Sequence, residues 1–162
     1  MPERSPIRPT DDGARQLARA LITGARFGAV GVSDPEDGTP LVSRVAIGTD
    51  RGGHPVTLIS DLSRHTQALR LSPDCSLLLG EPGTKGDPLT HPRITLQCQA
   101  RFVGNEGDDH ISIRERFSTT HPKSKLYIDF ADFRFVRFAV RHAFLNGGFG
   151  KAFHLRPTDL GL

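Results

Sequence analysis

The 162-residue sequence contains no tryptophan, one tyrosine, one methionine and two cysteines. It has no apolar run near the roughly 20 residues that cross a bilayer, so no membrane segment and no membrane partner are expected. The first residues lack the apolar stretch of a secretory signal, and we therefore expect a cytoplasmic protein. Without an export signal, Cys75 and Cys98 are expected to be reduced and buried rather than bridged.

Positive charge is in slight excess and is scattered along the chain. Lysine and arginine number 21 against 18 aspartate and glutamate residues, a net charge of +3. Such a weak excess does not predict a nucleic-acid partner. The glycine-rich loops GxGxxG and P-loop are also missing. The length suits one domain, which we place at residues 12–162 behind a flexible N-terminal arm at residues 1–11.

The residues after this arm have the apolar spacing of one helical face, with Asp11 or Asp12 as N-cap and Gly24 as the probable end. Short β-rich segments and turns then follow, typical of a meander sheet or barrel. The predicted strands are Phe27–Ser33, Leu41–Ile47, Val56–Ser60, Ser76–Leu79, Arg93–Val103, Arg134–Phe144 and a short closing strand after Gly148. Helices are predicted at Ser63–Leu71, Asp108–Phe117 and, for a turn or two, Ser124–Phe130. The fold class is mainly β with flanking helices.

The strongest local signal for function is a set of polar residues near a predicted helix start. If the hairpin turn centres near Gly52, antiparallel pairing puts Arg44 about opposite Ser60. The helix that begins at Ser63 would add free backbone N–H groups, the positive end of its dipole and the side chains of Arg64 and His65. This combination predicts a phosphate site, the alternative being a capped surface helix with solvated charges.

Six segments in the same order resemble a known family. They are Arg44 on its strand, ISDLSRHTQAL, SPDCSLLL, DPLTHPRITLQCQARFV, HPKSKLYIDFADFRFVRFAV and GGFGKAF. Together they are similar to the pyridoxamine 5′-phosphate oxidase-like FMN-binding split barrels, and most of all to the haem-utilisation (HugZ/HutZ-like) branch. The similarity extends from about Asp12 to Leu155 and so covers nearly the whole chain.

This resemblance implies a six-stranded antiparallel split β-barrel of Greek-key type that forms a homodimer with FMN at the subunit interface. It also implies a flavin-dependent oxidoreductase with a small-molecule substrate, although it assigns no catalytic residue. Pyridoxamine-phosphate oxidation is not expected, because the substrate-site tryptophan of those oxidases has no counterpart here. The cofactor-binding residues that it implies are Ser43, Arg44, Val45, Ser60, Ser63, Arg64, His65 and Arg93.

Two alternatives remain open on the same fold. The first is a haem-binding or haem-degrading protein, in which His154 would be the axial ligand because histidine is the commonest proximal choice. The second is an interaction module without either ligand. No two histidines have the sequence spacing of a metal site, and no metal is expected. The residues interpreted as surface or structural are His54, His91, His110, His121 and His142.

Overall fold

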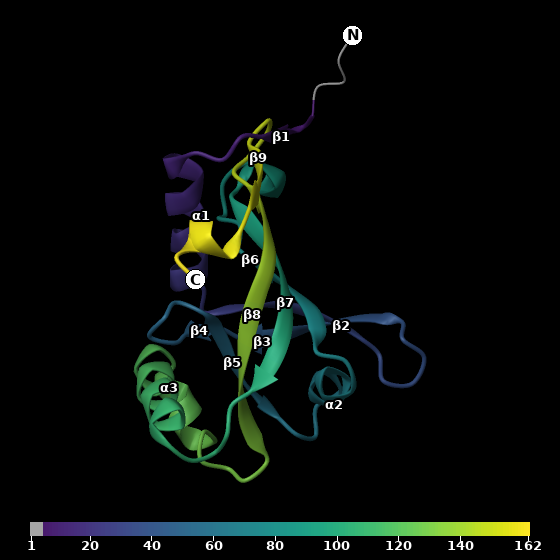
Figure 1. The fold of residues 1–162 in the computed structure, drawn as a ribbon, viewed down its shortest axis with the longest axis vertical. Helices are drawn as coiled ribbons and strands as arrows, with labels where there is room; N and C mark the ends of the chain where they lie inside the picture. Colours follow the sequence, from purple (N-terminus) through teal and green to yellow (C-terminus); the bar gives the residue numbers. More distant parts are fainter. Residues whose placement is uncertain (1–4) are drawn as a thin grey trace.

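The computed structural model describes residues 5–162 as one mainly β structure with three α-helices (Figure 1). The strands are β1 (Ile7–Arg8), β2 (Phe27–Ser33), β3 (Pro40–Ala46), β4 (Gly48–Thr49), β5 (Pro55–Ser60), β6 (Asp74–Leu79), β7 (Arg93–Phe102), β8 (Phe133–Asn146) and β9 (Ala152–Leu155). The helices are α1 (Asp12–Gly24), α2 (Arg64–Leu71) and α3 (Asp108–Thr120). Short 3-10 turns occupy Pro88–Thr90, Pro122–Leu126 and Pro157–Leu160.

The strands form a single sheet that curls into a split barrel. Its main path runs β1-β9-β8-β7-β6-β2-β3, and β5 pairs with both β8 and β4. After β3 the chain passes Ile47, whose N–H bonds to the Arg26 carbonyl at 2.9 Å, and continues into β4. The partners of β5 in the described chain are β4 and β8, so no ladder joins β3 to β5. The predicted fold class, a mainly β split barrel with flanking helices, is confirmed.

Most predicted elements are present with small shifts of their ends. Strand β2 covers the predicted range, and α1 begins after Asp11, whose carboxylate accepts the Ala14 N–H at 2.7 Å. The exception is the helix predicted at Ser124–Phe130. A 3-10 turn forms earlier, at Pro122–Leu126, where Pro122 sits at the start of the turn. Proline is tolerated at such a start because it lacks only an N–H that would be unpaired anyway.

The N-terminal arm differs from the expected flexible segment. Ile7–Arg8 pairs in parallel with β9, and the Thr10 hydroxyl donates to the His154 carbonyl at 3.1 Å. The chain is therefore tied to the barrel at residues 7–10. The first part of the predicted arm, residues 1–4, lies outside the described residues.

Two apolar cores hold the molecule together. The larger lies inside the barrel and beneath α1, where Leu77, Leu96 and Phe138 are fully buried. The smaller lies between α3 and strands β5 and β8, and it includes Phe117 and Phe135. In Figure 1 the helices α1 and α3 flank the barrel towards opposite ends. Each helix thus covers its own apolar surface.

The two cysteines belong to the larger core. Cys75 and Cys98 are cross-strand neighbours on β6 and β7, and both are free and buried, as predicted. Burial raises the pKa of the Cys75 thiol to about 12 and raises that of Cys98 as well. Because the thiolate is the reactive form, both side chains serve as apolar packing residues.

Candidate functional site

A pocket of about 540 Å³ opens beside the edge strand β3 and the loop between β6 and β7. Its lining combines an aromatic ring, aliphatic side chains and two arginines. The lining residues are Phe27, Gly28, Ala29, Val42, Ser43, Arg44, Leu78, Gly80, Glu81, Pro82, Pro88, Leu89, His91 and Arg93. Three of the residues predicted to bind a cofactor, Ser43, Arg44 and Arg93, therefore share one cavity.

Neither arginine of this pocket has a carboxylate partner among residues 5–162. The Arg44 guanidinium carbon lies 5.4 Å from the centre of the Phe27 ring, a cation–π contact. Arg93 donates to the Leu89 carbonyl at 2.9 Å, which fixes its direction without neutralising it. Glu81 also lines the pocket but forms no ion pair with either arginine. The pocket thus offers two uncompensated positive charges, which suits an anionic ligand.

The predicted pairing of Arg44 with Ser60 is wrong. Arg44 pairs with Ala29 on β2, and Ser60 pairs with Phe133 on β8. The cause is the break in the strand at Ile47. The segment after the break, β4, pairs with β5, and β3 does not. One edge of β3 is consequently unpaired from Pro40 to Ala46 in the structure as described, while Val45 on that strand is buried in the larger core.

The residues predicted to hold a phosphate gather at the start of α2, but several already have partners. The Arg64 guanidinium binds both carboxylate oxygens of Asp34, at 2.6 and 2.9 Å. The Ser60 hydroxyl lies 2.7 Å from an Asp132 carboxylate oxygen, to which it donates. Ser63 is the N-cap residue, yet its side chain forms no capping hydrogen bond. Its hydroxyl is therefore available to a ligand.

Other donors at the start of α2 are also available. The backbone N–H groups of Arg64 and His65 have no partner among the described residues, as is usual in a first helical turn. The Nε2 atom of His65 is buried without a hydrogen bond, and burial lowers the pKa of this side chain. Burial therefore favours the neutral form of His65. None of these residues lines the pocket that contains Arg44.

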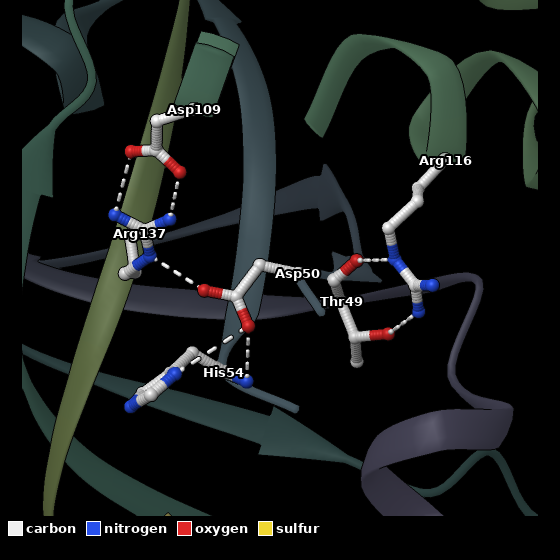
Figure 2. Close-up of polar contacts among 6 residues, drawn as sticks. All are labelled: Thr49, Asp50, His54, Asp109, Arg116 and Arg137. Carbon is white, nitrogen blue, oxygen red and sulfur yellow. Dashed lines mark hydrogen bonds and ion pairs between the residues drawn. The ribbon is translucent and has the colours of Figure 1, made fainter. Parts of the chain in front are cut away.

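A network of ion pairs that the sequence did not reveal fastens α3 to the barrel (Figure 2). The Asp50 carboxylate, 7% exposed, accepts from Arg137 Nε at 2.6 Å and from the His54 N–H at 2.9 Å. Arg137 also forms two bonds to Asp109 on α3, at 3.1 and 2.7 Å. Burial raises the pKa of Asp50, but the bonds from Arg137 and His54 outweigh it and lower the pKa overall.

His142 on β8 and His154 on β9 lie side by side on the outer face of these strands, which their spacing in the sequence did not predict. His142 Nδ1 lies 3.2 Å from His154 Nε2, and the His154 ring stacks on Phe144 at 4.9 Å between centroids. The signal available in the sequence was the hairpin turn at Gly147–Gly150, which sets the two strands in antiparallel register.

No cluster of three or more metal-ligating side chains occurs within residues 5–162. Over the same residues, no helix has the length and apolarity to cross a membrane.

These features define a split barrel with a positively charged pocket at one edge of the sheet. Residues 9–159 match the family described as CREG, beta-barrel, and the chain belongs to this family. Its fold is that of the pyridoxamine 5′-phosphate oxidase-like split barrels. No curated protein sequence is significantly similar to the chain.

Solved structures give the same picture of the fold. A haem-binding protein from Mycobacterium smegmatis is 28% identical, with a TM-score of 0.83 over 96% of this chain and 61% of its own. The chain thus spans less than two thirds of that relative. HutZ, the haem storage protein of Vibrio cholerae, is 18% identical, with a TM-score of 0.71 over 83% of this chain and 96% of its own.

A pyridoxinephosphate oxidase family protein from Clostridium acetobutylicum, related to general stress protein 26, is 13% identical to this chain. Its TM-score is 0.67 over 93% of this chain and 99% of its own. At identities of 18% and 13%, HutZ and the clostridial protein support the fold alone.

Proposed function

We propose that the chain is a flavoprotein that binds FMN as a homodimer and acts as an oxidoreductase on a small molecule. The observation that carries the proposal is Arg44 on the unpaired edge of β3, a guanidinium with no carboxylate partner among residues 5–162. An unneutralised arginine beside an apolar pocket favours an anionic ligand with a large planar face.

The start of α2 supplies the donors for a phosphate group. Several donors lie in one short segment at residues 63–65. They are the backbone N–H groups of Arg64 and His65 and the Ser63 hydroxyl, and the positive end of the helix dipole adds to them. Arg64 takes part through its backbone, because its side chain is held by Asp34. Arg44 lines the neighbouring pocket, and we propose that it adds positive charge for the same anionic ligand. Bound FMN would supply the electron transfer, and the protein would supply position and charge.

The pocket walls suit the flavin ring. Phe27 and Leu78 offer apolar surface, and Arg93 is held by the Leu89 carbonyl at the pocket rim. A hydrogen-bond donor near a flavin ring tunes its electronics, which is the role we assign to Arg93.

The apolar rim of the pocket supports a second copy as partner. Phe27, Val42, Leu78 and Leu89 are 41–68% exposed in the single chain. A contiguous apolar patch of this kind marks an interaction surface. We propose that the second copy covers this rim and closes the pocket around the cofactor.

A titration with FMN, followed by quenching of flavin fluorescence, tests the cofactor. Arg44→Ala should weaken binding by about tenfold to a hundredfold, the cost of one charge-assisted contact. Arg64→Ala should change it by less than about threefold, because its guanidinium is already paired. Arg101→Ala, an exposed arginine on β7, is the matched control. Equal affinities for wild type and Arg44→Ala would overturn the assignment.

Light scattering tests the dimer separately. The wild type should have about twice the 17.7 kDa mass of one chain. Val42→Glu, which puts a charge on the apolar rim, should shift the protein towards the monomer and weaken FMN binding together. A monomeric wild type that still binds FMN would contradict a cofactor enclosed by two subunits.

Haem is the second candidate, favoured by the 28% identity to the haem-binding protein of M. smegmatis. The His154 ring is exposed and stacks on Phe144, so an apolar face and an imidazole lie together. A haem titration at the Soret band, with wild type and His154→Ala, tests this reading. Submicromolar affinity that collapses in the variant, with a loss of the band on adding ascorbate, would make haem degradation the leading function.

A further inference from the structure

We propose that His142 and His154 form a binding site for a divalent transition-metal ion, separate from the proposed cofactor site. The ion would take His142 Nδ1 and His154 Nε2 as its two protein ligands, and water would complete its coordination. The observation that carries this inference is the meeting of these two exposed imidazoles, whose facing nitrogens are 3.2 Å apart.

This separation fits two ligands of one ion. Bonds of about 2.0–2.1 Å at a tetrahedral Zn²⁺ place two ligand nitrogens about 3.3–3.4 Å apart, and a square-planar arrangement brings them to about 2.8–3.0 Å. The observed 3.2 Å lies between these values. Binding one ion requires both facing nitrogens to be unprotonated, with the ring protons on His142 Nε2 and His154 Nδ1, and each ring to turn towards the ion.

The backbone brings both histidines to the same face of the sheet. Phe144 pairs with His154 across β8 and β9, so His142, two residues before Phe144, is the diagonal neighbour of His154. Diagonal pairs of long side chains are within reach of each other on one face. A bulge in β8 at Arg141, where Gln97 pairs with His142 and Cys98 with Val140, adds one residue to the strand. Bulges re-aim side chains in this way.

The surroundings hold His154 in place and leave the pair open to solvent. Its ring plane lies within 7° of the Phe144 ring plane, and its carbonyl accepts from the Thr10 hydroxyl. His142 and His154 are both exposed, which leaves room for water ligands. Arg141, which precedes His142 in the chain, forms an ion pair with Asp74 at 3.9 Å. The guanidinium is thus drawn towards Asp74.

The proposed metal site lies five strands along the sheet from Arg44. One cross-strand row runs through Arg44, Ala29, Leu78, Thr95, Phe144 and His154. Five strand spacings of about 4.8 Å separate its ends by about 24 Å along the sheet. The inference therefore does not depend on FMN binding at the β3 edge.

The donor set determines which ions bind. Two imidazoles and water suit borderline ions such as Cu²⁺, Ni²⁺ and Zn²⁺, and they do not suit Mg²⁺ or Ca²⁺, which prefer oxygen. The Irving–Williams order makes Cu²⁺ the tightest of the divalent ions. We therefore expect Cu²⁺ to bind more tightly than Ni²⁺ and Zn²⁺, and Mg²⁺ not to compete.

The test is a Cu²⁺ titration of the chain without a polyhistidine tag, followed by calorimetry and by electron paramagnetic resonance. The wild type should bind one Cu²⁺ per chain with hyperfine splitting from two nitrogens. His142→Gln and His154→Gln should each weaken binding by more than about tenfold, a loss that even outer-shell changes cause at metal sites. His54→Gln, in the Asp50 network, is the histidine control and should bind like the wild type.

Circular dichroism melting shows whether each variant is folded, so a loss of binding can be assigned to the missing ligand. A wild type that binds no stoichiometric Cu²⁺ would overturn the proposal. So would a folded His142→Gln variant with wild-type affinity, because a single histidine would then account for the binding. FMN affinity measured in the same variants should be unchanged, which keeps this result independent of the proposed function.

Discussion

Arginine side chains serve opposite purposes in two regions of the barrel, beneath α3 and at the edge of β3. Beneath α3, Arg137 binds the carboxylates of Asp50 and Asp109, and its charge is fully compensated (Figure 2). At the edge of β3, Arg44 faces a pocket with no carboxylate partner among the described residues, as does Arg93. The ion pairs of Arg137 stabilise the fold. The guanidinium of Arg44 can pair with a ligand, because no carboxylate among the described residues pairs with it.

The largest effect is expected from Arg137→Ala. The variant leaves the Asp50 carboxylate buried without its main partner, and this should lower the free energy of unfolding by about 3 kcal/mol. Urea denaturation at pH 7 measures the change. The exposed pair Arg114–Asp129 is the matched control, and Arg114→Ala should cost less than about 1 kcal/mol. Similar losses in both variants would mean that burial of Asp50 does not set the cost.

Asp50→Asn is expected to have an intermediate and pH-dependent effect of about 2 kcal/mol at pH 7. The pKa of Asp50 is lowered in the folded state, so its contribution to stability is full above the unfolded pKa of about 3.9. This contribution is lost as the pH falls through the lower, folded pKa. The difference between wild type and variant in urea should therefore shrink below pH 4. A constant difference from pH 7 to pH 3 would exclude Asp50 as its source.

The smallest effect is expected from Arg44→Ala. Since this side chain has a cation–π contact with Phe27 and no ion pair, the free energy of unfolding without ligand should change by less than about 0.5 kcal/mol. Thermal and urea unfolding of the FMN-free protein provide the measurement. A loss of stability as large as that of Arg137→Ala would show that Arg44 also stabilises the fold. The two arginines would then not differ in role.

Local patterns in the sequence predicted most of the helices and strands, whereas the split barrel was predicted from the family resemblance. The helical spacing with the Asp11 cap gave α1, and turn residues separated the strands, so β2 was predicted with its observed ends. Only part of the predicted set of site residues lies in one pocket. Ser43, Arg44 and Arg93 do share a pocket, but local patterns could not show that the chain breaks at Ile47 and changes the partner of β3.

Long-range contacts explain what the sequence did not reveal. Arg64 looked free to bind phosphate because Asp34, its partner, is 30 positions earlier in the chain. The Asp50–Arg137 pair joins residues 87 positions apart. The His142–His154 pair depends on the register of a hairpin and not on a helical spacing. Such contacts depend on tertiary packing, and the pattern of one sequence segment does not predict them.

The pairing of β1 with β9 has a consequence for how the protein is made. Ile7–Arg8 completes its ladder only with Ala152 and Phe153, and Arg15 on α1 binds Asp159 at 2.8 Å. Domains emerge from the ribosome with their N-terminal residues first, at about 5–20 residues per second. The first helix must therefore wait for nearly the whole domain before it meets these partners. Helix α1 and the strand before it thus cannot complete these contacts until residues 152–159 have been synthesised.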